Sequence, residues 1–243
     1  MLVHKVFAAV KEIFPPKAAE LVRAIFTALL TPLYFSYETG HFRSSLQRRP
    51  VDKNGNPIPW YTYPAIAFLA GGDFRERAVL EFGAGHSTLW WASRAREIVS
   101  FEEHAQWREY VQSIAPANVR VVAASRNLED IQPHLQGRRF DVVVIDGLDR
   151  VKASVVATEV IAPDGVIIVD NSDICWGPQG VYPIMDHFRA ANFYRMDFYG
   201  YTSSVMVTHC TSLLFKEHCF LLRGERNPVR RVAGGEAFAT ARV

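Results

Sequence analysis

The sequence predicts an α/β protein whose core is a doubly wound parallel sheet covered by helices on both faces. Three observations support this fold class. The 243 residues are 49% hydrophobic and 21% charged, which suits one large core. From residue 78 onward, short β-rich runs alternate with segments of helical length. A glycine-rich turn follows the first run, as in sheets that bind a ligand at the carboxyl ends of their strands.

Two helices are predicted ahead of this core. Apolar residues recur at helical spacing in residues 2–14 and again from about residue 18 to residue 30. The longest apolar stretch, Ala24–Phe35, has 12 residues and contains Pro32. A membrane-spanning helix needs about 20 residues, so no transmembrane segment is predicted. We expect both helices to pack on the core or on a second copy of the chain as a homodimer; peripheral contact with a membrane surface is the alternative.

The segment that joins these helices to the core, residues 36–64, is predicted to be an ordered loop. It loses the helical pattern and is dense in Gly, Pro, Asn and aromatic residues. We expect this loop to form a lid, with Trp60 and Tyr63 against the substrate. The alternative is that these rings only anchor the loop on the core. Residues 1–64 thus form an N-terminal extension to a core domain at residues 65–222.

Five buried strands are predicted to pair in parallel, because a segment long enough for a crossover helix separates each from the next. These strands are residues 78–82, 98–101, 119–123, 141–145 and 165–169. Two further β-rich runs follow at residues 194–199 and 211–220. The interval between them is short and rich in Ser and Thr, which favours antiparallel pairing. Residues 223–243, with five Arg against two Glu, are expected to form a flexible tail.

The charge balance and the cysteines exclude several classes of protein. The chain has 27 basic and 25 acidic residues, so nucleic acid is not the expected partner. The three cysteines, Cys175, Cys210 and Cys219, show no CxxC spacing, which indicates neither a disulfide framework nor a zinc site. Residues 1–14 lack the pattern of a secretory signal. We therefore expect a cytoplasmic protein.

The strongest local motif is the glycine turn after the first strand, with Glu81 two residues ahead of Gly83-Ala84-Gly85. Glycines let the backbone approach a ligand closely, and the site is predicted to hold a nucleotide; a purely structural turn is the alternative. The third glycine of a dinucleotide fingerprint would fall on Thr88, which disfavours NAD. The charge of Glu81 would repel a pyrophosphate, so a cationic ligand is favoured.

Acidic residues close three more strands at the same edge. Glu102 follows the second strand, where it can accept hydrogen bonds from both hydroxyls of a ribose. Asp146 follows the fourth strand, and Asp170 and Asn171 follow the fifth. These three oxygen-bearing side chains could hold Mg²⁺, although a capped turn at the strand end is an equal alternative for Asp170-Asn171.

Together these residues resemble class I S-adenosylmethionine-dependent methyltransferases. The resemblance rests on E-x-G-x-G at a strand end, an acid that closes the second strand and an Asp at the end of the fourth, and it spans residues 78–215. The segments TGHFRSS, PWYTYPAI, IDGLDR, VDNSD and CTSLLF further resemble a group of bacterial methyltransferase-like proteins. The family implies a Rossmann-like seven-stranded sheet of order 3-2-1-4-5-7-6 with the last strand antiparallel. It implies a site for S-adenosylmethionine lined by Glu81, Gly83, Gly85, Ser87, Glu102, Ser125 and Asp146.

The resemblance predicts methyl transfer to a small or medium acceptor, favoured to be a hydroxyl. Such a reaction needs alignment of the reactants and exclusion of water, and a hydroxyl acceptor also needs a base. The candidates for the base are Asp146, His41 and His209. The residues expected to contact the acceptor are Trp60, Tyr63, Arg150, Asp170 and Asn171.

Three alternatives stay open at this point. The residues Asp146, Asp170 and Asn171 are similar to the metal ligands of catechol-type O-methyltransferases, but the segment after Asp146 lacks the lysine base of those enzymes, so Mg²⁺ is not favoured. The chain could also be a non-catalytic nucleotide-binding member of the fold that acts as a partner or regulator, because a fold does not fix a function. An NAD-linked oxidoreductase is a third and weaker alternative.

Overall fold

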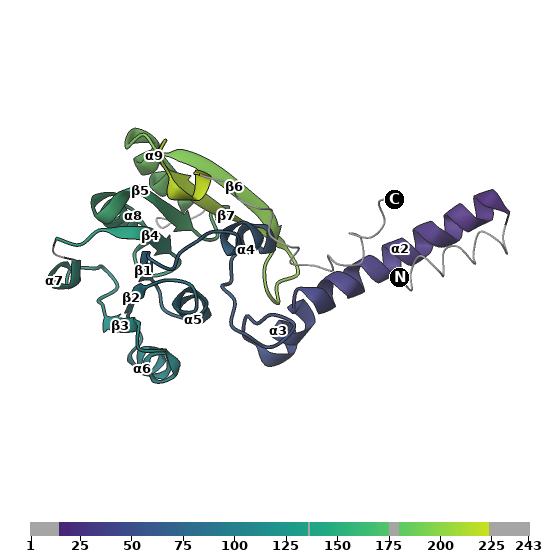
Figure 1. Cartoon of the computed structure of the whole chain (residues 1–243), viewed down its shortest axis with the longest axis horizontal. Helices are drawn as coiled ribbons and strands as arrows, with labels where there is room; N and C mark the ends of the chain where they lie inside the picture. The colour runs from purple at the N-terminus through teal and green to yellow at the C-terminus, as the bar shows by residue number, and fades with distance from the viewer. Residues whose placement is uncertain (1–14, 136, 175–179, 224–243) are drawn as a thin grey trace.

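The computed structural model describes residues 15–135, 137–174 and 180–223, and these contain the predicted seven-stranded sheet. The strands are β1 (Ala78–Phe82), β2 (Glu97–Glu102), β3 (Val119–Ala123), β4 (Phe140–Ile145), β5 (Ile161–Val169), β6 (Tyr194–Tyr201) and β7 (Thr208–Phe215). Their order is β3-β2-β1-β4-β5-β7-β6, with helices on both faces (Figure 1). The predicted doubly wound, Rossmann-like fold is confirmed.

The strand pairing places the carboxyl ends of five strands at one edge. Strands β1 to β5 run parallel, with Leu80 of β1 opposite Val99 of β2 and Val143 of β4. Strand β7 is antiparallel to both β5 and β6, as expected. All five residues of β1 are buried, which is typical of a central strand covered on both faces.

Two strand boundaries differ from the prediction by four residues or more. Strand β7 ends at Phe215 instead of continuing to Phe220, because the exposed residues 216–218 form a turn before a short 3₁₀ helix at Phe220–Leu222. Strand β5 starts at Ile161, four residues before the predicted start, and its register against β4 shifts near Phe140.

Alternate strand residues divide the core into two apolar layers. One layer includes Leu80 and Val143, and the other includes Val79 and Val142. The first layer is covered by α7 (Gln132–Leu135), α8 (Arg150–Val160) and α9 (Val181–Ala190). Residues of α4 (Tyr63–Ala70) and α5 (His86–Ala92) contribute to the second layer, and α6 (Ala105–Ile114) packs on β2 and β3. The alternation has the period of two residues that a β-strand imposes.

Helix α2 (Pro16–Glu38) is longer than the sequence predicts. The helix was expected to end near residue 30, but it continues through Pro32 to Glu38. Its last turn is closed by Thr39, whose backbone N–H and hydroxyl both donate to the carbonyl of Phe35. With 23 residues, α2 is long and apolar enough to cross a membrane. The expectation that no segment reaches this length is therefore corrected.

The extension joins the body through the carboxyl end of α2. Gly40 (φ +75°) connects α2 to α3 (His41–Gln47), and a Cβ there would lie 2.4 Å from the carbonyl oxygen of Val51. The ring of Phe35 packs against Tyr63 and Tyr201, with ring centroids 5.5 and 6.0 Å apart. The rest of α2 projects away from the sheet (Figure 1). The predicted helix at residues 2–14 and most of the predicted tail, residues 224–243, lie outside the described residues.

Candidate active site

A cavity of about 530 Å³ lies at the carboxyl ends of the central strands. The strand ends contribute residues 83–87 after β1, 102–104 after β2, 146–148 after β4 and 170–171 after β5. The lid segment and the β6–β7 connection contribute Arg48, Arg49, Pro50, Trp60, Thr202 and Val205, and β7 contributes His209. This is the edge at which doubly wound sheets bind ligands.

The glycine turn opens backbone toward this cavity. Gly83 has φ +107°, and a Cβ at this position would lie 3.2 Å from the carbonyl oxygen of Asp146. Only glycine adopts this conformation without strain. At Gly85, a Cβ would meet no protein atom within 4 Å, so the space in front of it is free for a ligand. Gly83 is therefore required by its backbone conformation, whereas Gly85 leaves room for a ligand.

Glu81 is fully buried beneath this turn and does not line the cavity. The hydroxyl of Ser100 donates to its Oε2 at 2.6 Å, while its Oε1 has no hydrogen-bond partner. Burial raises the pKa of Glu81 to about 7, against the opposing effect of the nearby hydroxyls of Ser100, Thr88 and Ser87, of which only Ser100 is within hydrogen-bond geometry. A buried carboxyl with an unpartnered oxygen favours a nearby donor or cation.

Glu102 lines the cavity and holds the turns on either side of it. Its Oε2 accepts a hydrogen bond from the backbone N–H of Ala84 at 3.2 Å. Its Oε1 accepts from the backbone N–H of His104 at 2.9 Å and lies 3.1 Å from Nδ1 of the same residue. A carboxylate has about four acceptor directions, so these bonds leave capacity for a hydroxyl of a ligand.

Asp146 and Asp170 end neighbouring strands at the cavity. The guanidinium of Arg150 donates to the backbone carbonyl of Asp170 at 2.6 Å and lies 3.7 Å from Oδ1 of Asp146. Burial raises the pKa of Asp146 to about 6, against the opposing charge of Arg150; water moderates this rise, because the side chain is 26% exposed. Burial also raises the pKa of Asp170 well above its usual range, and its Oδ1 accepts a hydrogen bond from the Thr211 hydroxyl at 2.7 Å. Burial therefore favours the protonated form of Asp170.

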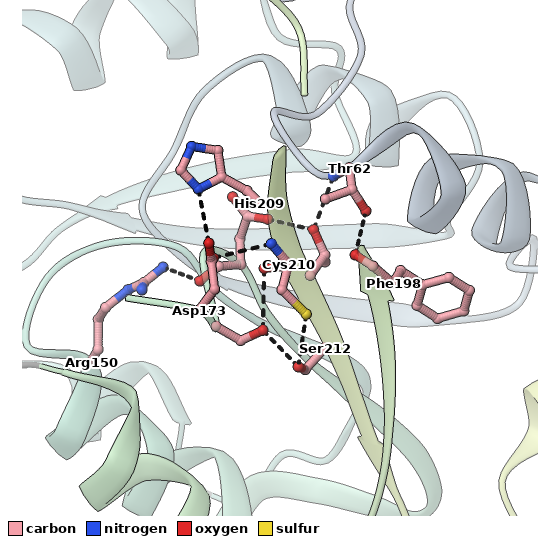
Figure 2. A network of polar contacts seen from close by, with 10 residues as sticks. Thr62, Arg150, Asp173, Phe198, His209, Cys210 and Ser212 are labelled. Carbon is pink, nitrogen blue, oxygen red and sulfur yellow. Dashed lines mark hydrogen bonds and ion pairs between the residues drawn. The ribbon is translucent and has the colours of Figure 1, made fainter. Parts of the chain in front are cut away.

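His209 is paired with a carboxylate at the rim of the cavity. Its Nδ1 lies 3.2 Å from Oδ2 of Asp173, and the other oxygen of Asp173 accepts from the backbone N–H of Cys210 at 3.1 Å (Figure 2). A carboxylate that accepts from Nδ1–H leaves Nε2 of the imidazole as the proton acceptor. His209 is thus equipped to act as a base.

The predicted lid segment, residues 36–64, is held at the strand ends by hydrogen bonds. The backbone N–H of Thr62 donates to the Thr211 hydroxyl at 2.9 Å, and the Thr62 hydroxyl donates to the carbonyl of Phe198 at 3.0 Å (Figure 2). Indole Nε1 of Trp60 donates to the carbonyl of Ser203 at 2.8 Å. The lid position is therefore set by β6, β7 and their connection.

Besides Glu81, four predicted site residues lie away from the cavity lining. His41 is next to Tyr63, with 3.5 Å between Nδ1 and the phenol oxygen, and burial lowers the pKa of His41. Tyr63 is itself 5% exposed, in the core below the lid. Ser125 donates to Asp130 and forms a turn after β3. Arg150 bonds the strand ends described above. The other predicted residues, except Glu81, all line the cavity.

Sequence reasoning missed several lining residues. Trp107 of α6 lines the cavity and donates from Nε1 to the carbonyl of Ala84 at 2.7 Å. Its position five residues after Glu102 is a signal that could have been used. Arg48 and Arg49 carry no sequence signal, because they reach the cavity through the fold of the lid. Asp173 stood inside the quoted VDNSD segment without an assigned role.

The described residues do not fit a magnesium site. No group of three or more His, Cys, Asp or Glu side chains in residues 15–135, 137–174 and 180–223 could hold a metal ion. One of the three predicted ligands, Asp170, is 1% exposed and accepts the Thr211 hydroxyl. We derive no step through a metal.

A comparison with known families gives the class of the domain that forms this cavity. Residues 80–172 match a family model described as "Methyltransferase domain". This stretch contains the glycine turn and the ends of β2, β4 and β5 that shape the cavity. The chain carries a class I S-adenosylmethionine-dependent methyltransferase domain. Its sheet order, with β7 antiparallel, is the order that the resemblance implied.

Several solved structures align with this methyltransferase domain at low sequence identity. Precorrin-6y C5,15-methyltransferase from Geobacter metallireducens aligns over 63% of this chain and 87% of its own, with 13% identity and a TM-score of 0.50. Rv0187 from MTB, solved with its cofactor bound, aligns over 61% and 77%, with 21% identity and a TM-score of 0.48. A provisionally named O-methyltransferase from Klebsiella pneumoniae aligns over 57% and 72%, with 16% identity and a TM-score of 0.48. No curated protein sequence matches the chain.

The residues of the methyltransferase domain fit S-adenosylmethionine. The unpartnered oxygen of Glu81 and the free space at Gly85 suit a cationic ligand that approaches the backbone closely. The free acceptor capacity of Glu102 suits a ribose, and the indole of Trp107 offers an aromatic face. When bound, the cofactor supplies a methyl group on a positively charged sulfur. The chain supplies alignment of the two reactants and exclusion of water.

Proposed function

We propose that this methyltransferase acts on a hydroxyl group of a small or medium acceptor, and that His209 takes the proton from that hydroxyl. The observation that carries the proposal is the His209–Asp173 pair at the cavity rim, with 3.2 Å between Nδ1 and the carboxylate. As the acceptor oxygen bonds to the methyl carbon, the bond from that carbon to the sulfonium sulfur would break, S-adenosylhomocysteine would be the leaving group, and the O–H proton would move to Nε2 of His209. Asp173 then stabilises the imidazolium.

The other two candidate bases are less suited to this task. His41 does not line the cavity. Asp146 lines it, but the guanidinium of Arg150 lies 3.7 Å from its Oδ1 and stabilises the charged form. The near balance of 27 basic and 25 acidic residues supports a small acceptor over a nucleic acid. The three cysteines, which show no CxxC spacing, support a cytoplasmic catalytic domain.

The test is methyl transfer by the full chain from labelled S-adenosylmethionine to matched hydroxyl and amine acceptors. We expect a methyl ether as product, identified by mass spectrometry and by the carbon shift of the new methyl group. Methylation of nitrogen or carbon alone would overturn the hydroxyl proposal. Cofactor binding without any turnover would favour a regulatory member of the fold.

The base is tested by His209→Asn. We expect kcat to fall by about 10²–10⁴-fold, the usual contribution of a general base, with cofactor affinity unchanged within about twofold. The matched control is His218→Asn in the exposed turn after β7, which should leave kcat unchanged. A pH–rate profile of His209→Asn that keeps the ascending limb of the wild type would remove His209 from the role of base.

A further inference from the structure

Helix α2 exposes large apolar side chains around more than half of its circumference. At 3.6 residues per turn, nine residues make two and a half turns, so Leu21 and Leu30 face opposite directions. Their exposed fractions are 62% and 47%, and those of Leu29 and Leu33 between these directions are 65% and 67%. Ala19 is the buried residue of the helix. The described part of the chain therefore does not cover this apolar surface.

The remaining side of α2 carries charged residues only near the two ends of the helix, at Lys17, Glu20, Arg23 and Glu38. Between Arg23 and Glu38 the sequence contains no charged residue. The hydroxyl of Thr27 donates to the carbonyl of Arg23 at 2.8 Å, so this polar group is satisfied by its own helix. A helix that lies on a membrane surface, or one that packs in a soluble dimer, normally keeps a charged face toward water. The stretch from residue 24 to residue 37 has no charged residue on any side and instead fits an apolar medium.

The uncharged part of α2 is long enough to enter a lipid bilayer. Residues 24–37 span about 21 Å at 1.5 Å per residue, within a hydrocarbon core that is about 30 Å thick. Pro32, which would be costly in the middle of a soluble helix, is tolerated in membrane helices. Both properties favour a lipid bilayer as the medium around α2.

The base of α2 carries the residues that anchor proteins at a membrane surface. Helix α3 lies at this base (Figure 1), and its Phe42 and Leu46, one turn apart, are 67% and 74% exposed. Three arginines, Arg43, Arg48 and Arg49, occupy the same short stretch. Exposed apolar side chains enter the interface, and arginines attract anionic lipid headgroups.

We propose that α2 inserts into a lipid bilayer and that α3 rests on its anionic headgroups. Arg48, Arg49 and Trp60 line the cavity, so its rim is continuous with this membrane-facing base. If the proposed hydroxyl methylation holds, on which this last step rests, the acceptor is an amphiphilic hydroxyl compound taken from the membrane surface. Binding of the bilayer itself does not depend on that step.

The experiment is flotation of the full chain with vesicles of phosphatidylcholine and phosphatidylglycerol. We expect the wild type to float with the vesicles and to remain bound after a wash in high salt. The double variant Leu29→Arg/Leu33→Arg should lose at least about 100-fold in partition, because arginine is strongly disfavoured in the hydrocarbon. The control Val155→Arg, at a 43% exposed apolar position on α8, should float like the wild type. Cofactor binding by each variant checks that the domain is folded.

Three results would overturn the proposal. The first is wild-type chain that stays with the buffer as a dimer in sedimentation velocity, which would make a second copy the occupant. The second is release by the salt wash, which would indicate attachment through the arginines alone. The third is an intact mass from cells that lacks α2, which would make this helix a removed leader. Flotation needs no turnover, so its failure and the failure of the proposed methylation are separate outcomes.

Discussion

The substitution Glu81→Gln tests whether the buried carboxyl beneath the glycine turn destabilises the protein at neutral pH. The folded-state pKa of about 7 compares with an ordinary value of 4.5. Between these values the folded protein binds more protons than the unfolded chain, so the contribution of Glu81 to the free energy of unfolding falls as pH rises. At 1.36 kcal/mol per pKa unit, the full loss is about 3 kcal/mol. The side chain is fully buried, so no correction for solvent applies.

The assay is urea unfolding of the wild type and Glu81→Gln at pH 5 and pH 8. Glutamine removes the ionisation and keeps the shape, so the stability of the wild type relative to the variant should fall by about 2–3 kcal/mol from pH 5 to pH 8. Comparison with the variant cancels the parallel effects of Asp146 and Asp170. Glu109→Gln, on the exposed side of α6, is the control for loss of a carboxylate and should show no such change. The reasoning fails if the difference between wild type and Glu81→Gln is equal at both pH values.

Two further predictions concern cofactor binding, measured by calorimetry with S-adenosylhomocysteine. Glu102→Gln should raise the Kd about 5–30-fold, because charge-assisted hydrogen bonds become neutral ones, while Glu103→Gln, whose nearest basic atoms are 3.9 and 4.0 Å away, should change it less than about threefold; equal effects would remove Glu102 from the ribose site. Gly85→Ala should keep its stability within about 0.5 kcal/mol and bind at least about tenfold more weakly, whereas Gly83→Ala should lose about 1–3 kcal/mol of stability through its positive φ. Unchanged affinity in Gly85→Ala would show that the ligand does not approach this backbone.

The fold followed from the sequence wherever burial alone dictates the local structure. Strands β1 and β3 have the predicted boundaries. Strand β1 is a central strand with every residue buried, and β3, at the edge of the sheet, is a short run rich in β-branched Val. The end of β7 was wrong because Cys219 and Phe220 are also buried or half-buried, but in a 3₁₀ turn that follows three exposed residues. Apolar content shows that a residue packs, and it does not show in which local structure.

Helix α2 shows the opposite limit. The prediction ended the helix early because Pro32 removes a backbone donor and disfavours a helix interior. The helix nevertheless continues, since the loss of one hydrogen bond does not end a segment whose last turn is closed on Phe35. Propensity at a single residue is a weak guide to where a helix ends. The full length of α2 was therefore known only from the structure, in which the residues before and after Pro32 form one helix.

The site residues also divide into those that the sequence can locate and those that it cannot. Glu102, Asp146 and Asp170 line the cavity because a parallel sheet brings its strand ends to one edge, and strand ends can be located from sequence. His41 and Ser125 belong to segments whose side-chain direction depends on loop conformation, which the sequence pattern does not contain. The His209–Asp173 pair joins residues from β7 and from the turn after β5, 36 positions apart, so it required the antiparallel pairing of these two strands.

The burial of acids at this edge explains how stability and function oppose each other here. Glu81, Asp146 and Asp170 all have a raised pKa whose first cause is burial. Arg150 is the cation placed between two of them, and it offsets part of the cost, while one oxygen of Glu81 has no partner. A protein selected only for stability would replace such groups by apolar residues of similar size. Their retention beneath and beside a glycine turn is reasonable if a positively charged ligand completes the set, because that ligand would then bind most tightly where the free protein is least satisfied.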